Sequence, residues 1–155
     1  MVERGARNPT YLSHSASSGS HDDQFKREIE SMGCSIQMVR RDVTNADDVA
    51  RAIGGVVAPL KGIIQMSMVL RDCMSRDMTF QDASLAAKCQ LDFFLLFSSM
   101  SGILGQVGQA NYASANTFLD AFARYRAGMG LPCTSLDLGA MEESVGYLVE
   151  NQDLL

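Results

Sequence analysis

The sequence predicts an α/β fold with a mostly parallel sheet. Five short segments rich in apolar or β-branched residues alternate with segments in which apolar residues recur at helical spacing. One of the five, residues 93–97, is apolar on both sides, which is typical of a strand covered by helices on both faces of a parallel sheet. With 155 residues, the chain is expected to form one domain, 1–155, with a sizeable core.

The order of elements follows from apolar spacing and from helix-ending residues. Gly5, Gly33 and Pro59 provide helix ends, and Thr44 is the expected cap of the helix that follows it. The expected strands are 10–13, 35–43, 62–70, 93–97 and 133–138. The expected helices begin with the end of one at 1–4 and continue with one of about three turns that carries Phe25, Ile29 and Met32. The others are 44–58, 79–88 and 110–127, the last with an inward side of Ala115, Phe118, Phe122 and Tyr125.

Composition excludes several classes of function. A net charge of -5 and no basic run argue against nucleic acid as a partner. No apolar run is long enough to span a membrane, and the first residues lack the apolar core of a signal peptide, so we expect a cytoplasmic protein with no membrane contact. The cysteines Cys34, Cys73, Cys89 and Cys133 are scattered, which predicts free thiols and no metal site.

The segment from Ser98 to Asn116 carries the candidate chemistry. Tyr112 and Asn116 are one helical turn apart, and Ser99 precedes Tyr112 by 13 residues, at the end of the buried strand. Three glycines in the loop allow it to fold back so that the serine and the tyrosine meet. A serine that hydrogen-bonds a carbonyl oxygen and a phenol that transfers its proton suit reduction of a carbonyl. The phenol needs a nearby cation to act at neutral pH.

Other interpretations of the same residues remain open. A tyrosine near a helix start is often a packing residue, a strand-end serine often caps a helix, and an asparagine often ties down a loop. The glycines could also form a phosphate loop. Their spacing by three, however, differs from the G-x-G-x-x-G of dinucleotide-binding turns.

The long motif SSMSGILGQVGQANYASAN in its strand-loop-helix context resembles the ketoreductase domain of a polyketide synthase. The resemblance is strongest to the fungal highly reducing type, within the short-chain dehydrogenase/reductase family. It runs almost end to end, through LSHS, RDV, KGIIQMSMVL, GLP and LDLGAME. It implies a Rossmann-like, doubly wound parallel sheet that here lacks its first strand.

The resemblance also implies a reaction and its residues. Such domains reduce the β-keto group of an acyl thioester bound to an acyl carrier protein, with NADPH as cofactor and other polyketide synthase domains as partners. By position, Tyr112 would be the proton donor, Ser99 the hydrogen-bond donor to the carbonyl, and Asn116 the asparagine of Y-x-x-x-N. The implied cofactor-binding residues are Ser13, His14, Asp42, Val43, Gln65, Met66, Ser67 and Gly139.

Three departures from the family pattern lead to a second hypothesis. The glycine-rich turn after the family's first strand is missing ahead of Met1, and His14 stands where an arginine usually binds the cofactor phosphate. Residues 79–91 are also shorter than the family's helix, so that Lys88 is the one lysine there that could pair with Tyr112. The alternative is therefore a non-catalytic remnant of a ketoreductase domain that does not bind NADPH by itself.

Overall fold

The computed structural model describes residues 1–16, 19–67 and 91–139. These ranges contain five strands, and every pairing between them is parallel. The described residues fall into two compact units: the first holds the chain up to Lys61 together with Leu91 and Asp92, and the second begins at Gly62 and resumes at Phe93. The predicted α/β fold with parallel strands is confirmed, and the described strands are divided between two sheets, β1-β2 and β3-β4-β5.

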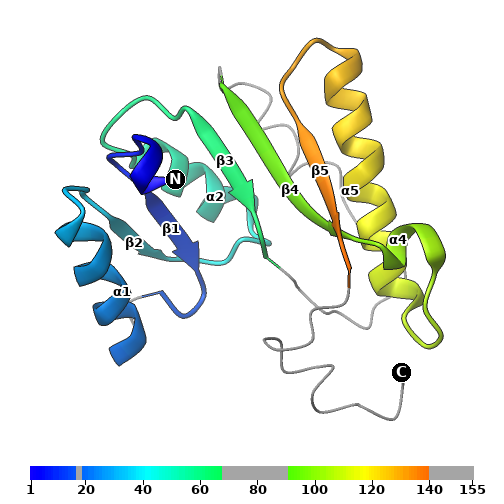
Figure 1. Ribbon diagram of the computed structural model, residues 1–155, viewed down its shortest axis with the longest axis horizontal. Helices are drawn as coiled ribbons and strands as arrows, with labels where there is room; N and C mark the ends of the chain where they lie inside the picture. Colours follow the sequence, from blue (N-terminus) through cyan, green and yellow to red (C-terminus); the bar gives the residue numbers. More distant parts are fainter. Residues whose placement is uncertain (17–18, 68–90, 140–155) are drawn as a thin grey trace. The chain divides into compact units, whose positions relative to one another are not determined.

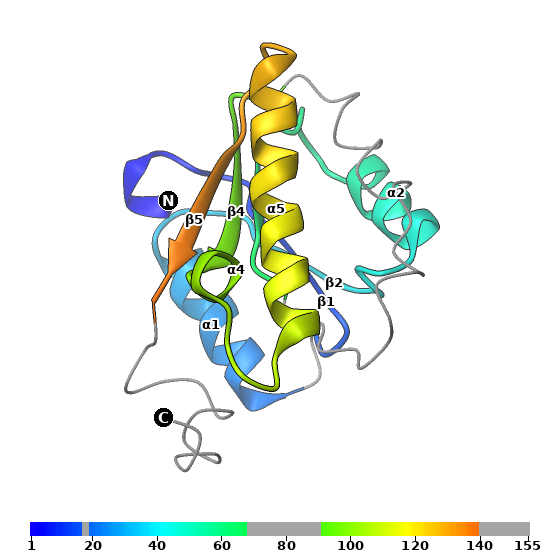
Figure 2. The same cartoon turned by 90° about the vertical axis from the view of Figure 1, so that its right-hand side faces the viewer.

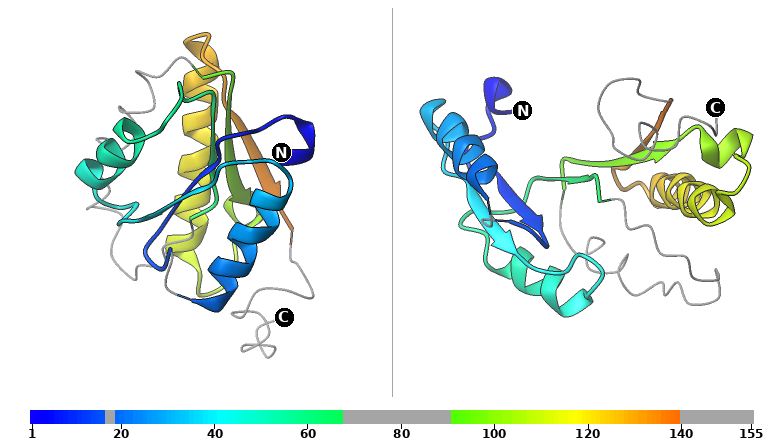
Figure 3. Two further views of the ribbon diagram at one scale, coloured as in Figure 1. Left: turned by 90° about the vertical axis from the view of Figure 1, so that its left-hand side faces the viewer. Right: turned by 90° about the horizontal axis from the view of Figure 1, so that it is seen from below.

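The first unit is a two-stranded parallel sheet between two helices. Its elements are η1 (Val2–Arg4), β1 (Thr10–Ser13), α1 (Ser20–Ser31), β2 (Gln37–Arg40) and α2 (Ala46–Gly54) (Figure 1). The helices α1 and α2 lie on opposite sides of the sheet (Figures 2 and 3). The rings of Tyr11 on β1 and Phe25 on α1 meet edge to face, with centroids 6.2 Å apart. The core is small, because the buried apolar residues among the described part of this unit are Ala16, Cys34, Ile36, Ala52 and Leu91.

The start of α2 corrects the prediction that Thr44 caps this helix. Asn45 is the capping residue, and its side-chain oxygen accepts hydrogen bonds from the backbone N–H groups of Asp47 and Asp48 at 2.9 and 3.2 Å. The Thr44 hydroxyl instead donates to the carboxylate of Asp42 at 2.7 Å. Asparagine and threonine both suit a helix cap. Because the Thr44 side chain is bonded to Asp42 in the preceding turn, Asn45 is the residue that caps the helix.

The second unit is a three-stranded parallel sheet with a long helix on one face. Its described elements are β3 (Gly62–Gln65), β4 (Phe93–Ser99), α4 (Ser101–Leu104), α5 (Ala110–Gly128) and β5 (Thr134–Leu138). β4 lies between β3 and β5, and α5 runs along β4 and β5 (Figure 2). The predicted strand 62–70 is observed as far as Gln65, and its end lies outside the described residues, as does the predicted helix 79–88.

Packing between β4 and α5 forms the core of the second unit. Phe94 meets Phe122 edge to face with ring centroids 6.1 Å apart, and Leu96 is only 1% exposed. Tyr125 is 61% exposed, so the prediction that it points inward is wrong. The neighbouring Arg126 is buried in its place, with its guanidinium 5.2 Å from the centre of the Phe94 ring. Successive residues of an α-helix are rotated by about 100°, so a shift of the buried side by one residue, from Tyr125 to Arg126, explains the difference.

The opposite face of β4 is less buried than predicted. Phe93 is 40% exposed, and Leu95 and Phe97 are half-buried. Phe93 pairs with Gly62 on β3, and its ring lies where a Cβ on that glycine would stand. Among the residues that the structure describes, α5 covers one face of this strand, which is the face of Phe94 and Leu96.

Candidate active site

The predicted site residues of the second unit lie at the carboxyl edge of its sheet. The strand register places Gln65 level with Leu96, and Ser99 level with Leu138. Gly139 therefore follows directly beside the end of β4. Because β3, β4 and β5 are parallel, their carboxyl ends share one edge, which is where ligands bind in open α/β sheets.

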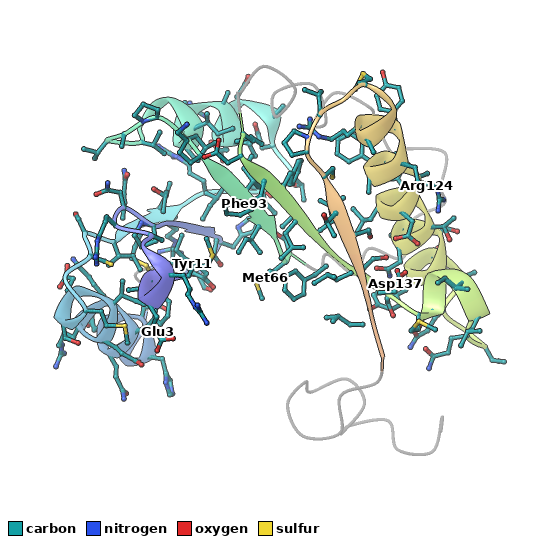
Figure 4. All side chains as sticks on the ribbon, turned by 45° about the horizontal axis from the view of Figure 1, so that its top comes forward. Glu3, Tyr11, Met66, Phe93, Arg124 and Asp137 are labelled. Atoms are coloured by element: carbon teal, nitrogen blue, oxygen red, sulfur yellow. The ribbon has the colours of Figure 1, made fainter. Side chains whose placement is uncertain are left out.

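The residues after β3 are accessible at this edge. Met66 is 66% exposed and projects from the end of β3 (Figure 4), and Ser67 is also exposed. The Gln65 side-chain amide donates to the backbone carbonyl of Ser67 at 3.0 Å, which fixes the turn. Met66 and Ser67 therefore follow the last residue of β3 as exposed residues that a ligand could reach.

Hydrogen bonds join the end of β4 to the first turns of α5. The Ser98 hydroxyl donates to the backbone carbonyl of Asn116 at 3.2 Å, across 18 residues of sequence. The Thr117 hydroxyl donates to the carbonyl of Gly102 at 2.9 Å. The loop between strand and helix therefore folds back, as its glycines predicted. Sequence reasoning missed Ser98 and Thr117 as positioning residues, although Ser98 continues the alternation of buried residues on the α5 face of β4.

The glycines of this loop have different structural roles. Residues 101–104 form the short helix α4 where a loop was predicted, and a Cβ at Gly102 would lie 3.0 Å from the backbone nitrogen of Thr117. Gly102 is therefore needed for the close approach of α4 and α5. Gly105 and Gly108 have φ angles of 73° and 77°, in the left-handed region that other residues adopt at a cost.

Ser99 and Asn116 already take part in local hydrogen bonds. Ser99 is 8% exposed, and its oxygen accepts a bond from the backbone N–H of Ser101 at 3.2 Å. Asn116 is 5% exposed, and its amide donates to the backbone carbonyl of Tyr112 at 2.8 Å. The Ser99 oxygen accepts in this bond, so its hydroxyl proton remains available to a ligand. Tyr112 is half-buried in the first turn of α5.

In the first unit, His14 and Asp42 meet where β1 and β2 end. The Nε2 atom of His14 lies 3.1 Å from a carboxylate oxygen of Asp42. Ser13 ends β1, and Val43 follows Asp42 as a half-buried residue. The predicted cofactor-binding residues of this unit thus gather at the carboxyl edge of its two-stranded sheet, whereas those of the second unit gather at the edge of the other sheet.

The turn after β2 holds two carboxylates in their charged form. Hydrogen bonds from the side chain and backbone of Thr44 lower the pKa of Asp42 below 3.8, with a smaller contribution from the charge of His14. The backbone N–H of Asp42 lowers the pKa of Asp48, and Arg51 and Arg41 add to that effect. Asp48 forms ion pairs with Arg51 at 2.7 Å and with Arg41 at 3.8 Å.

A separate cavity lies between α5 and β5. Its volume is about 340 Å³, and its lining includes Arg124 on α5 and Asp137 on β5 (Figure 4). Burial raises the pKa of the Cys133 thiol beside it above 9.0. None of the predicted site residues lines this cavity, so we do not assign it to the carbonyl chemistry.

Some sequence predictions fall outside the described residues or concern absences. Lys88 is among the residues that the structure does not describe. Within the described part of the chain, Cys34 and Cys133 are free thiols, and no group of histidine, cysteine and acidic residues could hold a metal ion. The helices in that part include none with the length and apolar character needed to cross a membrane.

Parallel strands with helices, and polar groups gathered at the strands' carboxyl ends, define a Rossmann-like α/β protein. Comparison with known sequences refines that class. The chain belongs to the KR domain family, which matches residues 1–143. The predicted resemblance to polyketide synthase ketoreductases is thereby confirmed.

Its sequence relatives include fungal highly reducing polyketide synthases. The sphB synthase of Aspergillus fumigatus is 48% identical over 172 aligned residues, which cover 100% of this chain and 7% of that protein. The lcsB synthase of Purpureocillium lilacinum is 46% identical, with coverage of 100% and 7%. Since the first alignment is longer than the 155 residues of this chain, that synthase has positions without a counterpart here.

Solved ketoreductases share the fold. An A1-type ketoreductase is 27% identical with a TM-score of 0.84, over 98% of this chain and 36% of that one. An A-type ketoreductase from a modular polyketide synthase is 25% identical with a TM-score of 0.83, over 97% and 36%. The chain therefore spans about a third of the length of these solved structures.

Proposed function

We propose that this chain reduces the β-keto group of an acyl thioester, carried on an acyl carrier protein, with NADPH as reductant. The observation that carries the proposal is the hydrogen bond from Ser98 to the backbone of Asn116, because it holds the end of β4 against the helix that carries Tyr112. Membership of the KR domain family supports the reaction class. The relatives are polyketide synthases much longer than this chain, which makes other synthase domains its proposed partners.

The residues have distinct roles in this reaction. The Ser99 hydroxyl donates a hydrogen bond to the keto oxygen and orients the carbonyl. The Tyr112 hydroxyl donates the proton that this oxygen needs to become an alcohol. Asn116 holds the first turns of α5 through its bond to the Tyr112 carbonyl, and so acts as a positioning residue. When bound, NADPH would supply the hydride that reaches the keto carbon.

The chemistry of the strand ends fits this cofactor. At the ends of β1 and β2, the Ser13 hydroxyl and the Asp42 carboxylate provide polar groups for an adenosine, beside the apolar Val43 and the imidazole of His14. At the ends of β3 and β5, the exposed residues Met66, Ser67 and Gly139 are candidates to contact a nicotinamide riboside. Lys88 remains the candidate cation for Tyr112, by its place in the sequence.

The test is consumption of NADPH in the presence of a small β-ketoacyl thioester. We expect the chain to oxidise NADPH and the Tyr112→Phe variant to lose at least about 100-fold in kcat, which is the usual scale for removal of a general acid. Tyr125→Phe is the matched control, because Tyr125 lies on the same helix and is 61% exposed. Equal rates for the chain and for Tyr112→Phe would contradict the proposal.

A second candidate is a non-catalytic part of a ketoreductase domain. It is favoured by the aligned positions of the sphB synthase that have no counterpart here. This candidate predicts that the chain adopts the fold but does not bind NADPH. Titration with NADPH, monitored by calorimetry, separates the two: saturable binding supports the enzyme, and its absence in a folded chain supports the non-catalytic part.

A further inference from the structure

Arg40 lies beside the turn that follows β1. It pairs with Ser13 in the parallel register, so the two side chains lie on the same face of the sheet. Its Nε atom donates to the backbone carbonyl of His14 at 3.1 Å. This bond places the guanidinium next to the serine-rich turn at residues 13–15, although Arg40 is far from that turn in the sequence.

Among the described residues, the charged side chains near Arg40 are paired with one another, and Arg40 itself is in no ion pair. His14 lies 3.1 Å from the Asp42 carboxylate, and Arg41 and Arg51 pair with Asp48. Within the described ranges, no carboxylate forms an ion pair with Arg40. The Nη groups of Arg40 are therefore the fixed positive charge that this strand edge can offer to an anion.

The turn that accepts the hydrogen bond from Arg40 also carries two serine hydroxyl groups. The oxygens of Ser13 and Ser15 are 3.3 Å apart, and the Ser15 backbone N–H points at the Ser13 hydroxyl, also at 3.3 Å. A guanidinium next to hydroxyls is a donor set that suits a phosphate monoester. NADPH differs from NADH by one such phosphate, on the adenosine ribose.

We propose that Arg40, and not His14, is the residue that selects NADPH over NADH, by binding the ribose phosphate together with the Ser13 hydroxyl. This inference rests on the proposed function, because it concerns the cofactor of that reaction. A guanidinium keeps its charge at any pH at which the protein is folded, whereas an imidazole does not. The bond to the His14 carbonyl makes Arg40 part of the turn, so the strand β2 supplies the cation that the turn itself lacks.

The experiment compares two nucleotides that differ only in this phosphate, adenosine 2′,5′-bisphosphate and adenosine 5′-monophosphate, by calorimetric titration of the full chain. We expect the chain to bind the bisphosphate more tightly. In Arg40→Gln, affinity for the bisphosphate should fall about 10- to 100-fold, the scale of a lost charge-assisted hydrogen-bond pair, with affinity for the monophosphate unchanged. Arg40→Lys, which keeps the charge but not the fork of donors, should retain part of the preference.

Two control variants decide whether the effect belongs to Arg40. His14→Gln tests the competing cation, and Arg41→Gln removes a neighbouring arginine that is paired with Asp48. Both should keep the preference for the bisphosphate. Loss of the preference in His14→Gln but not in Arg40→Gln would overturn the inference. Equal loss in Arg41→Gln and Arg40→Gln would also overturn it. So would equal affinity of the unmodified chain for both nucleotides.

The titrations and the NADPH-consumption assay, carried out with NADPH and with NADH, together separate this inference from the proposed reaction. If the chain prefers the bisphosphate through Arg40 but does not oxidise NADPH with a ketoacyl thioester, the role of Arg40 is supported and the proposed activity is contradicted. If the chain reduces the thioester equally well with NADH and NADPH, the proposed activity is supported and the role of Arg40 is contradicted. Thermal melts of each variant confirm that the surface substitutions leave the fold intact.

Discussion

The strand ends of the two units hold their polar groups in different ways. In the second unit, Ser98, Ser99 and Asn116 are 4%, 8% and 5% exposed, and each forms a hydrogen bond to the backbone. In the first unit, the side chains of His14 and Asp42 are 72% and 31% exposed, and they contact each other at 3.1 Å near the protein surface. Buried hydrogen bonds fix geometry, whereas exposed charges are screened by water and contribute little to stability.

This difference assigns separate tasks to the two edges. The second unit offers fixed hydroxyl groups, which suits a reaction that depends on the position of a carbonyl. The first unit offers accessible charges, which suits recognition of a charged ligand. Substitutions in the second unit should therefore change stability and geometry together, and those in the first unit should mainly change charge.

The largest expected effect is on the core beneath the second unit's site. Leu96→Ala should lower the free energy of unfolding by about 2–5 kcal/mol, because the side chain is 1% exposed and leaves a cavity between β4 and α5. Leu12→Ala, on the half-buried β1 of the first unit, should cost less. Urea denaturation combined with hydrogen exchange measures both. Equal costs would show that the first unit is as tightly packed as the second.

A smaller effect is expected where α4 meets α5. Gly102→Ala should lower the free energy of unfolding by about 1–3 kcal/mol, because the new methyl group would press on the backbone of Thr117 and on Asn116. It should also reduce the proposed ketoreductase rate, since Asn116 is bonded to Tyr112. Gly128→Ala is the matched control, because no atom lies within 4 Å of its added Cβ. Thermal melts in which both variants lose the same stability would contradict this account of the contact.

The smallest effect concerns the charged turn of the first unit. Because Thr44 lowers the pKa of Asp42 below 3.8, this carboxylate contributes stability that is fully present above pH 3.8 and is lost as pH falls through the folded-state pKa. Thr44→Ala should move that pKa back toward 3.8, whereas Thr44→Ser keeps both hydrogen bonds and should leave it low. Titration of the Asp42 carboxyl carbon by NMR measures the shift, and an identical value in the two variants would contradict the assigned cause.

Several parts of the fold could be predicted because their signals are local. The five strands are marked by apolar segments, and Gly5, with a φ angle of 107°, ends the first helical turn as expected. One error concerns the end of α2, which stops at Gly54 and not before Pro59 as predicted. Two others arise where neighbouring residues are similar. Asn45 caps α2 although Thr44 is equally suitable, and Arg126 is buried where Tyr125 was expected, because its guanidinium packs on the rings of Phe94 and Phe122.

The sequence by itself determined the α/β class, the family and the order of the polar residues that end the strands, since each is recorded in adjacent residues. Only the tertiary structure showed that Ser98 bonds to the backbone of Asn116, that Gly102 permits α4 to contact α5, and that Arg40 reaches the His14 carbonyl. Each of these contacts joins residues 14 or more positions apart. Strand register and helix docking decide which distant residues meet, and spacing along the chain does not record them.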